Sequence, residues 1–286
     1  MRKQFLKFLI ILVITLIFGL SFSVHADDFY TTCKEGSPAE ILEAINNGAE
    51  VNQKNSDGIT PLMTAARYNN NYRSLLVLYE NGAYVNSRDN NGWNALMYAI
   101  RYNENLDVIR VLLRMNSRVN ITDDNGNTPL IYAVKYRNEE IVSLLLSYGA
   151  NVNQSNQDKK TPLIFAIEGG LKTDIIDSLL LAGARVDIRD YRGRTPLFYI
   201  IEKGDYDLIK RFILFGAEVR ISDYKGITPM MLAAKEQRNV RSLEILNLER
   251  NNINKKDEDG LTALMYAARY NNNPKIINYL IDNGAQ

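Results

Sequence analysis

The chain has 286 residues, 23% of them charged, with 34 lysines and arginines against 33 aspartates and glutamates. A net charge of +1 excludes a general nucleic-acid binder, which needs a strong basic excess. A single cysteine, Cys33, excludes an intramolecular disulfide.

The first 26 residues have the order of a secretory signal peptide. Arg2, Lys3 and Lys7 form a positive start. An apolar run over residues 8–20 follows, and small residues end at Ala26. The run is shorter than the ~20 residues that a membrane-spanning helix needs. We therefore expect cleavage after Ala26 and export to the periplasm, with secretion or anchoring by an uncleaved signal as the alternatives.

Cleavage would also remove the only histidine, His25, and leave 31 basic against 33 acidic residues. Without histidine, a Ser-His-Asp or Cys-His relay and the usual zinc ligands are excluded. We therefore expect no enzyme and assign no catalytic, cofactor-binding or metal-binding residue.

A Thr-Pro-Leu tripeptide or a close variant recurs along the rest of the chain at steps of 34, 34, 33, 34, 33 and 34 residues. Its copies begin at Thr60, Asn94, Thr128, Thr161, Thr195, Thr228 and Thr262. A period in this range predicts a stack of similar supersecondary units.

Residues 124–156 show the content of one unit. After a turn at Gly126, Thr128 can cap a helix and Pro129 suits its first position. A second apolar helix follows, and Gly149 is placed to end it in a left-handed conformation. Each helix is too short to be stable alone, so stacking must join their apolar faces.

The opening Gly-x-Thr-Pro-Leu and the closing Gly-Ala-x-Val-Asn, as at residues 149–153, resemble the ankyrin repeat. The resemblance implies an all-α ankyrin-repeat solenoid of about eight helix-turn-helix repeats joined by β-hairpin-like turns. We expect one monomeric domain over residues 27–286. Its repeats are predicted at residues 29–55, 56–89, 90–123, 124–156, 157–190, 191–223, 224–257 and 258–286.

Two departures from the repeat pattern lead to local predictions. Cys33 takes the central small-residue position of the first repeat's opening helix, which predicts a buried, unreactive thiol. Lys159 replaces the glycine of a hairpin turn, which predicts a strained or rearranged hairpin there.

Members of the ankyrin-repeat family generally hold another protein on the concave surface formed by first helices and hairpin tips. On the helices, cation–tyrosine pairs in three consecutive repeats face this surface, and hairpin residues extend it. The predicted partner-binding residues are Arg67, Tyr68, Arg88, Trp93, Arg101, Tyr102, Lys135, Tyr136, Tyr191, Arg192 and Tyr224. Tyr, Trp and Arg often dominate interface energy.

Duplication of the repeat offers a competing explanation. Asn-rich loops follow two of the Arg-Tyr pairs, at residues 69–71 and 271–273, so the whole block can be copied without a ligand. Residues 56–150 are expected to offer an aromatic, cationic surface and residues 157–257 a mixed, more polar one, so an acidic ligand would favour the N-terminal half.

The resemblance implies a non-catalytic scaffold that binds an unidentified protein or peptide in the cell envelope. A secreted effector acting on host or competitor proteins is one alternative. A second is carboxylate-based glycan binding or hydrolysis, which requires an Asp/Glu pair facing each other across the concave surface, about 5–10 Å apart. Burial of Glu168 and Glu202 together would favour this alternative.

Overall fold

The structure, a computed structural model, describes residues 26–136, 138–170, 173–236, 240–247 and 253–286. Within these ranges there are sixteen helices and no strand, which confirms the all-helical fold. The predicted signal peptide lies outside the described residues, apart from Ala26, where the first helix begins. None of the sixteen helices is long and apolar enough to span a bilayer.

The helices belong to two compact units, which are divided between Arg118 and Val119. The helices of the first unit are α2 (Ala26–Glu35), α3 (Pro38–Asn46), α4 (Pro61–Tyr68), α5 (Tyr72–Glu80), α6 (Ala95–Tyr102) and α7 (Leu106–Arg114). Those of the second unit are α8 (Pro129–Lys135), α9 (Glu139–Ser147), α10 (Pro162–Glu168), α11 (Thr173–Leu181), α12 (Pro196–Lys203), α13 (Tyr206–Leu214), α14 (Pro229–Glu236), α15 (Arg241–Asn247), α16 (Ala263–Tyr270) and α17 (Pro274–Asp282).

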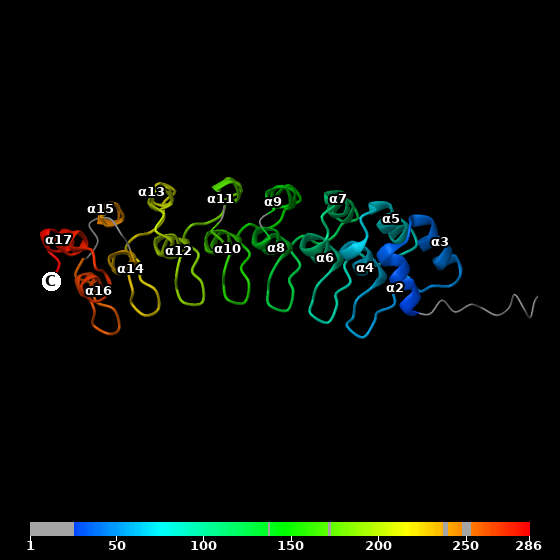
Figure 1. The fold of residues 1–286 in the computed structure, drawn as a ribbon, viewed down its shortest axis with the longest axis horizontal. Helices are drawn as coiled ribbons and strands as arrows, with labels where there is room; N and C mark the ends of the chain where they lie inside the picture. The colour runs from blue at the N-terminus through cyan, green and yellow to red at the C-terminus, as the bar shows by residue number, and fades with distance from the viewer. Residues whose placement is uncertain (1–25, 137, 171–172, 237–239, 248–252) are drawn as a thin grey trace, which may run out of the picture. The chain divides into compact units, whose positions relative to one another are not determined.

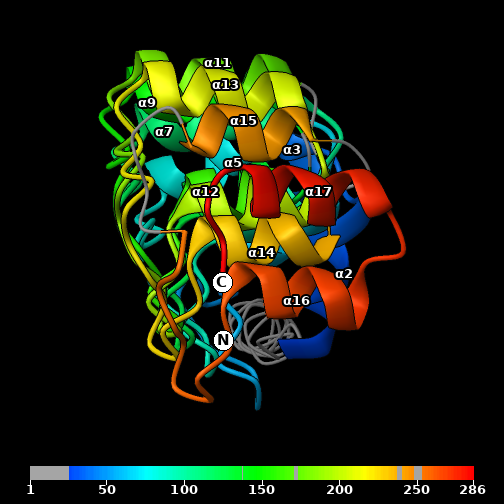
Figure 2. The same cartoon turned by 90° about the vertical axis from the view of Figure 1, so that its left-hand side faces the viewer.

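Each unit has two layers of helices. In the first unit, α4 packs between α2 and α6, while α5 packs between α3 and α7. In the second unit, α8, α10, α12, α14 and α16 follow one another in a row, with hairpin loops extending to one side (Figure 1). The end-on view shows α11, α13 and α15 as a second layer over α12 and α14 (Figure 2).

The Thr-Pro-Leu motif starts the first helix of a repeat as predicted. The Thr60 hydroxyl accepts the N–H of Met63, and Pro61 takes the first helical position, where its missing N–H costs no hydrogen bond. The same side-chain cap is formed at Asn94, Thr128, Thr161, Thr228 and Thr262. The motif leucine is then buried in the stack, as at Leu96 and Leu130. Stacking thus stabilises helices that have too few turns to stand alone.

Hairpin loops add hydrogen bonds along the stack. Asp89 Oδ1 accepts the N–H groups of Asn91 and Trp93, which holds one loop in shape. The Asn90 N–H then donates to the Asp57 carbonyl of the preceding loop at 3.0 Å. Successive loops are therefore joined through the backbone, and side chains add to the contact, since Asn90 Nδ2 also donates to the Ser56 carbonyl at 2.9 Å.

Where the closing motif ends in asparagine, that residue joins its repeat to the next. Asn153 donates from Nδ2 to the Gly183 carbonyl and accepts the Arg185 N–H at Oδ1, at 3.0 and 2.8 Å. The same two-bond contact is made by Asn52, Asn86, Asn120 and Asn254. In the fifth repeat Asp187 takes this position, and its carboxylate pairs with Arg185 instead.

Lys159 keeps the turn conformation of the glycine it replaces. Its φ is 56°, in the left-handed region, and its N–H donates to Asn156 O at 2.9 Å. Gly126 makes the equivalent bond with a φ of 78°. The expected strain is present, because a side chain in this region crowds the backbone, but the expected rearrangement is wrong.

Replacing Lys159 with glycine should raise the free energy of unfolding by about 1 kcal/mol, because the left-handed strain exceeds the added chain entropy. Urea denaturation followed by circular dichroism measures this change. Gly260→Lys is the reciprocal control: Gly260 has a φ of 77° with no atom within 4 Å of an added Cβ, so strain alone should destabilise that variant. A destabilised Lys159→Gly protein would show that the lysine side chain, rather than backbone strain, decides the stability of this turn.

Candidate binding site

The predicted partner-binding residues divide between the two units. The first unit contains Arg67, Tyr68, Arg88, Trp93, Arg101 and Tyr102, and the second contains Lys135, Tyr136, Tyr191, Arg192 and Tyr224. The contacts within each unit show which of these residues the fold brings together.

Arg67 is the centre of an aromatic cluster in the first unit. It lies in the last turn of α4, beside α6. Its guanidinium carbon lies 4.7 Å from the ring centroid of Tyr68, 4.3 Å from that of Tyr102 and 5.7 Å from that of Tyr98. These distances are within the ~6 Å range of a cation–π interaction. The two predicted tyrosines are therefore linked through a guanidinium.

Trp93 and Tyr98 form the base of the cluster. The Trp93 ring lies 5.3 Å from Tyr98 and 6.3 Å from Tyr102, and Tyr98 stacks on Tyr102 at 6.2 Å. Tyr98 is 7% exposed, whereas Tyr68 and Tyr102 are 45% and 44% exposed. We call Arg67, Tyr68, Trp93, Tyr98 and Tyr102 the Arg67 cluster: its base is fixed by packing, and two of its rings face solvent.

The asparagines after the Arg-Tyr pairs have a structural role. Asn69 is buried and donates to the carbonyls of Cys33 and Gly36, and Asn103 likewise donates to Ala66 and Asn69. Asn271 makes the equivalent bonds in the second unit. Packing between repeats thus accounts for the asparagine of the Arg-Tyr-Asn block and leaves the solvent-facing tyrosines unexplained.

A buried tyrosine–aspartate pair fixes the base of the cluster, and the repeat pattern did not predict this pair. Tyr98 donates its hydroxyl to Asp89 Oδ2 at 2.7 Å. Burial, and then this hydrogen bond, raise the pKa of the Tyr98 phenol well above its ordinary value near 10. The pair recurs as Tyr132–Asp123, Tyr199–Asp190 and Tyr266–Asp257. An aspartate nine residues before a tyrosine, four times over, is the signal that could have revealed it.

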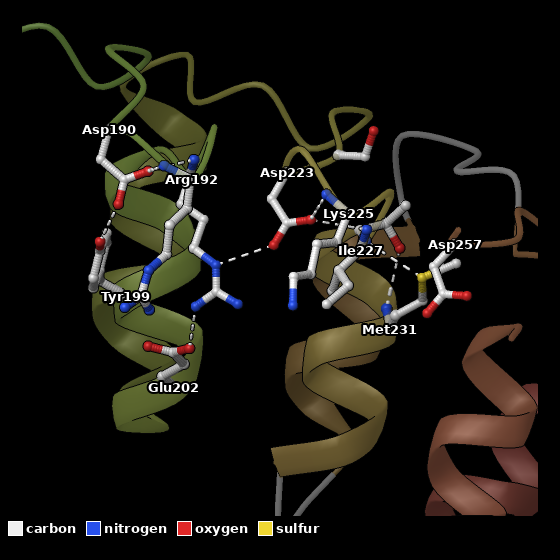
Figure 3. Close-up of polar contacts among 12 residues, drawn as sticks. Asp190, Arg192, Tyr199, Glu202, Asp223, Lys225, Ile227, Met231 and Asp257 are labelled. Atoms are coloured by element: carbon white, nitrogen blue, oxygen red, sulfur yellow. Dashed lines mark hydrogen bonds and ion pairs between the residues drawn. The ribbon is translucent and has the colours of Figure 1, made fainter. Parts of the chain in front are cut away.

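Where the tyrosine is missing, the preceding hairpin supplies the hydrogen-bond donor. Leu232 stands nine residues after Asp223, and Asp223 Oδ2 instead accepts from Arg194 Nε of that hairpin at 3.1 Å. Arg194 Nη1 also donates to Glu202 Oε1 at 2.6 Å, so one guanidinium bridges the carboxylates of Glu202 and Asp223, both labelled in Figure 3. The same figure shows the Tyr199 phenol directed to Asp190.

The two glutamates that a glycan-cleaving site would need are both ion-paired. Glu168 accepts from Lys160 Nζ at 2.6 Å, and Glu202 accepts from Arg194. Their side chains are 32% and 37% exposed. The two glutamates are therefore not buried together but paired with separate cations, and the geometry gives the hydrolytic alternative no support.

The predicted residues of the second unit form smaller groups. The Tyr136 ring stacks on Tyr132 at 6.2 Å, and Lys135 lies 5.3 Å from the Phe165 ring. Arg192 Nε donates to the Tyr191 hydroxyl at 2.7 Å. The Tyr224 ring lies against the backbone at Gly193, where an added Cβ would come within 2.7 Å of it. Tyr224 therefore contributes to packing between hairpins, although 58% of it is exposed.

A pocket of about 250 Å³ lies next to the Arg67 cluster, within the first unit. The residues that line it are Tyr30, Asn55, Ile59, Met63, Thr64, Arg67, Tyr68 and Tyr98. Within the described part of the chain, no group accepts a hydrogen bond from the buried Nε of Arg67. An unpaired buried donor costs free energy, so this atom marks a place where an acceptor would be stabilised.

A hollow of about 420 Å³ between α2 and α3 is lined by Asp28, Glu35, Glu40 and Glu43, among others. Two of these carboxylates are engaged: Glu35 pairs with Lys34, and Glu40 accepts the Ser37 N–H at the start of α3. In the part of the chain that the structure describes, no group of three or more acidic, cysteine or histidine side chains could hold a metal ion.

Cys33 is fully buried in α2, which confirms the predicted burial. Burial raises the pKa of its thiol to about 12. Because the thiolate is the reactive form, a thiol with this pKa is almost entirely protonated and inert near neutral pH.

Exposed leucines lie near the ends of α11 and α13, and the repeat pattern did not predict them. Leu181 and Leu214 are 88% and 79% exposed, and Phe215 beside Leu214 is 52% exposed. The equivalent position in other repeats holds a polar residue, for example Glu80 in α5. The helical period alone would not identify them, because leucine at a helix end is ordinary in a buried face.

The family model described as "Ankyrin repeats (3 copies)" matches the chain in overlapping segments: residues 29–123, 72–156, 102–190, 151–220, 169–248 and 197–286. Together these segments span the whole array of helix pairs. The search of curated proteins returned no match.

Tyr98→Phe should lower the free energy of unfolding by about 1–3 kcal/mol, because it leaves the buried Asp89 carboxylate without its tyrosine donor. Chemical denaturation of the purified chain measures the loss. Tyr102→Phe is the matched control, since its ring keeps the same contacts and its exposed position predicts a change within about 0.5 kcal/mol. Equal effects of the two substitutions would mean that the hydrogen bond to Asp89 does not stabilise the fold.

Proposed function

The chain belongs to the ankyrin-repeat family, and we propose that it holds a partner protein on the exposed rings of the Arg67 cluster without catalysing a reaction. Proteins built from ankyrin repeats are generally non-catalytic scaffolds that bind other proteins. The unreactive thiol of Cys33, together with a lone histidine within the predicted signal peptide, supports a binding role.

One observation carries the choice of surface: two half-exposed tyrosines are held in place by a central arginine and a packed aromatic base. Tyr68 and Tyr102 each contact Arg67, and Tyr102 also rests on Trp93 and Tyr98. Rings that are already ordered lose little conformational entropy when a partner covers them. Tyrosine, tryptophan and arginine are also the residue types that most often dominate interface energy.

Tyr68→Ala/Tyr102→Ala should weaken partner binding at least tenfold, as expected for the removal of two interface anchors. The partner would first be captured from a cell-envelope extract, purified and titrated calorimetrically against wild type and variants. Tyr79→Ala/Tyr84→Ala is the matched control, because these tyrosines are 42% and 69% exposed in the same unit but lie outside the cluster. A partner that binds both double variants equally well would place the interface on another surface.

We propose that the chain acts after export, with the periplasm as its place. The charged start, the apolar run and the small residues before Asp27 support this proposal.

Export predicts a mature N-terminus at Asp27 in the periplasmic fraction, measured by intact mass and N-terminal sequencing. Ala26→Arg should block cleavage and leave the precursor mass, because the peptidase requires a small residue there. Recovery of the uncleaved wild-type chain from the cytoplasm would contradict export.

A further inference from the structure

The hairpin before α4, together with α4 itself, lacks both members of the tyrosine–aspartate pair. Asn55 stands where most other hairpins have the aspartate, and Thr64 stands at the position of the tyrosine. The hairpin before α10 also has an asparagine, Asn156, but Phe165 still fills the ring position there. At the second repeat the smaller threonine leaves space, and the pocket of about 250 Å³ includes both Asn55 and Thr64 in its lining.

The two replacements also reverse the polarity of the position. Asn55 Oδ1 accepts the N–H groups of Asp57 and Ile59, just as Asp89 Oδ1 accepts from its own loop. The second terminal atom of Asn55 is therefore an amide nitrogen, in place of the carboxylate oxygen that Asp89 offers to Tyr98. An acceptor has been exchanged for a donor.

Arg67 brings a positive charge to the pocket, and its contacts with two rings determine from which side an acceptor can reach the guanidinium. The ring centroids of Tyr68 and Tyr102 lie within 4.7 Å of its guanidinium carbon, and none of the described residues accepts a hydrogen bond from its buried Nε. Stacking on aromatic faces leaves the in-plane N–H groups of a guanidinium to bind a planar acceptor, which a carboxylate matches. The eight lining residues include no aspartate or glutamate that could take this role.

The size of the pocket limits what can occupy it. A cavity of about 250 Å³ is smaller than the ~300–1,000 Å³ sites that hold cofactors and drug-sized ligands. It is suited to the end of one side chain from a larger partner. The pocket also adjoins Tyr68 and Tyr98, so a segment lying on the Arg67 cluster could place a side chain in it.

We infer that this pocket binds the carboxylate of a glutamate or aspartate side chain on the partner protein, with Arg67 as its counter-ion and Asn55 and Thr64 as further hydrogen-bond donors. The inference rests on the proposed function, since the acidic side chain belongs to the protein held on the cluster. It adds a chemical requirement: the bound segment must be acidic at one point beside the tyrosines.

Sodium propionate, which has the end group of a glutamate side chain, is the probe, and propionamide is its uncharged control. Titration of the isotope-labelled chain should shift the Nε–Hε resonance of Arg67 and the backbone resonance of Thr64 saturably with propionate. Propionamide should bind at least tenfold more weakly, because it lacks the charge that strengthens the hydrogen bonds. The absence of a saturable shift, or equal shifts with both compounds, would overturn the inference.

Asn55→Asp/Thr64→Tyr is the decisive variant, since it rebuilds the pair found in four other repeats. It should fold with at least wild-type stability and lose the propionate-induced shift, because the new ring fills the pocket. In Arg67→Gln the pocket stays open, but the backbone resonance of Thr64 should no longer shift with propionate. A shift that persists in either variant would assign binding to surface arginines, and tighter binding of inorganic phosphate than of propionate would overturn the carboxylate assignment.

The purified partner separates this inference from the proposed function. Partner binding that is lost in Tyr68→Ala/Tyr102→Ala but unchanged in Asn55→Asp/Thr64→Tyr would keep the scaffold and reject the pocket. Loss in both variants, with the propionate shift present in wild type, supports the two together.

Discussion

Within each unit, the stability of the fold depends on contact between neighbouring repeats, because a single helix pair is too small to bury its own apolar faces. The helices are short, and their motif leucines become buried only where successive pairs stack. Polar contacts then fix the spacing of the stack: a backbone hydrogen bond between successive hairpins, and the two-bond contact of residues such as Asn153. A regular stack in turn presents first-helix side chains of adjacent repeats close enough to interact, which is how Arg67 meets Tyr102.

The aspartate found in most hairpins needs a hydrogen-bond donor for each carboxylate oxygen, and different residues supply the second donor. Its first oxygen holds the loop, and its second must find a donor because it is buried. Tyr98 supplies that donor to Asp89, and Arg194 of the preceding hairpin supplies it to Asp223. At Asn55 the requirement disappears with the charge, and the ring that served it is absent as well. With neither a buried carboxylate that needs a donor nor a tyrosine ring to supply one, this position has space for a pocket.

Much of the fold was predictable because its signals are local. Thr60 and Pro61 specify a helix start by themselves, and the 33–34-residue period specifies stacking. The candidate site was predictable only in part. The exposed positions of Tyr68 and Tyr102 follow from helical spacing, but the pairing of Tyr98 with Asp89 joins a helix to a hairpin across nine residues, which matches no secondary-structure period. The placement of Arg67 between two rings depends on side-chain packing against the next repeat, which periodicity does not encode.

The substitution at Asp187 has a consequence for cooperativity. An aspartate has no N–H to donate, so the fifth repeat cannot bind the Gly216 carbonyl of the sixth as Asn153 binds that of Gly183. In a linear array, stability is a sum of repeat terms and nearest-neighbour terms, and a break in folding follows the weakest neighbour term. The junction between the fifth and sixth repeats therefore lacks a hydrogen bond that Asn153 supplies to the junction before it, which weakens the coupling between the repeats on either side.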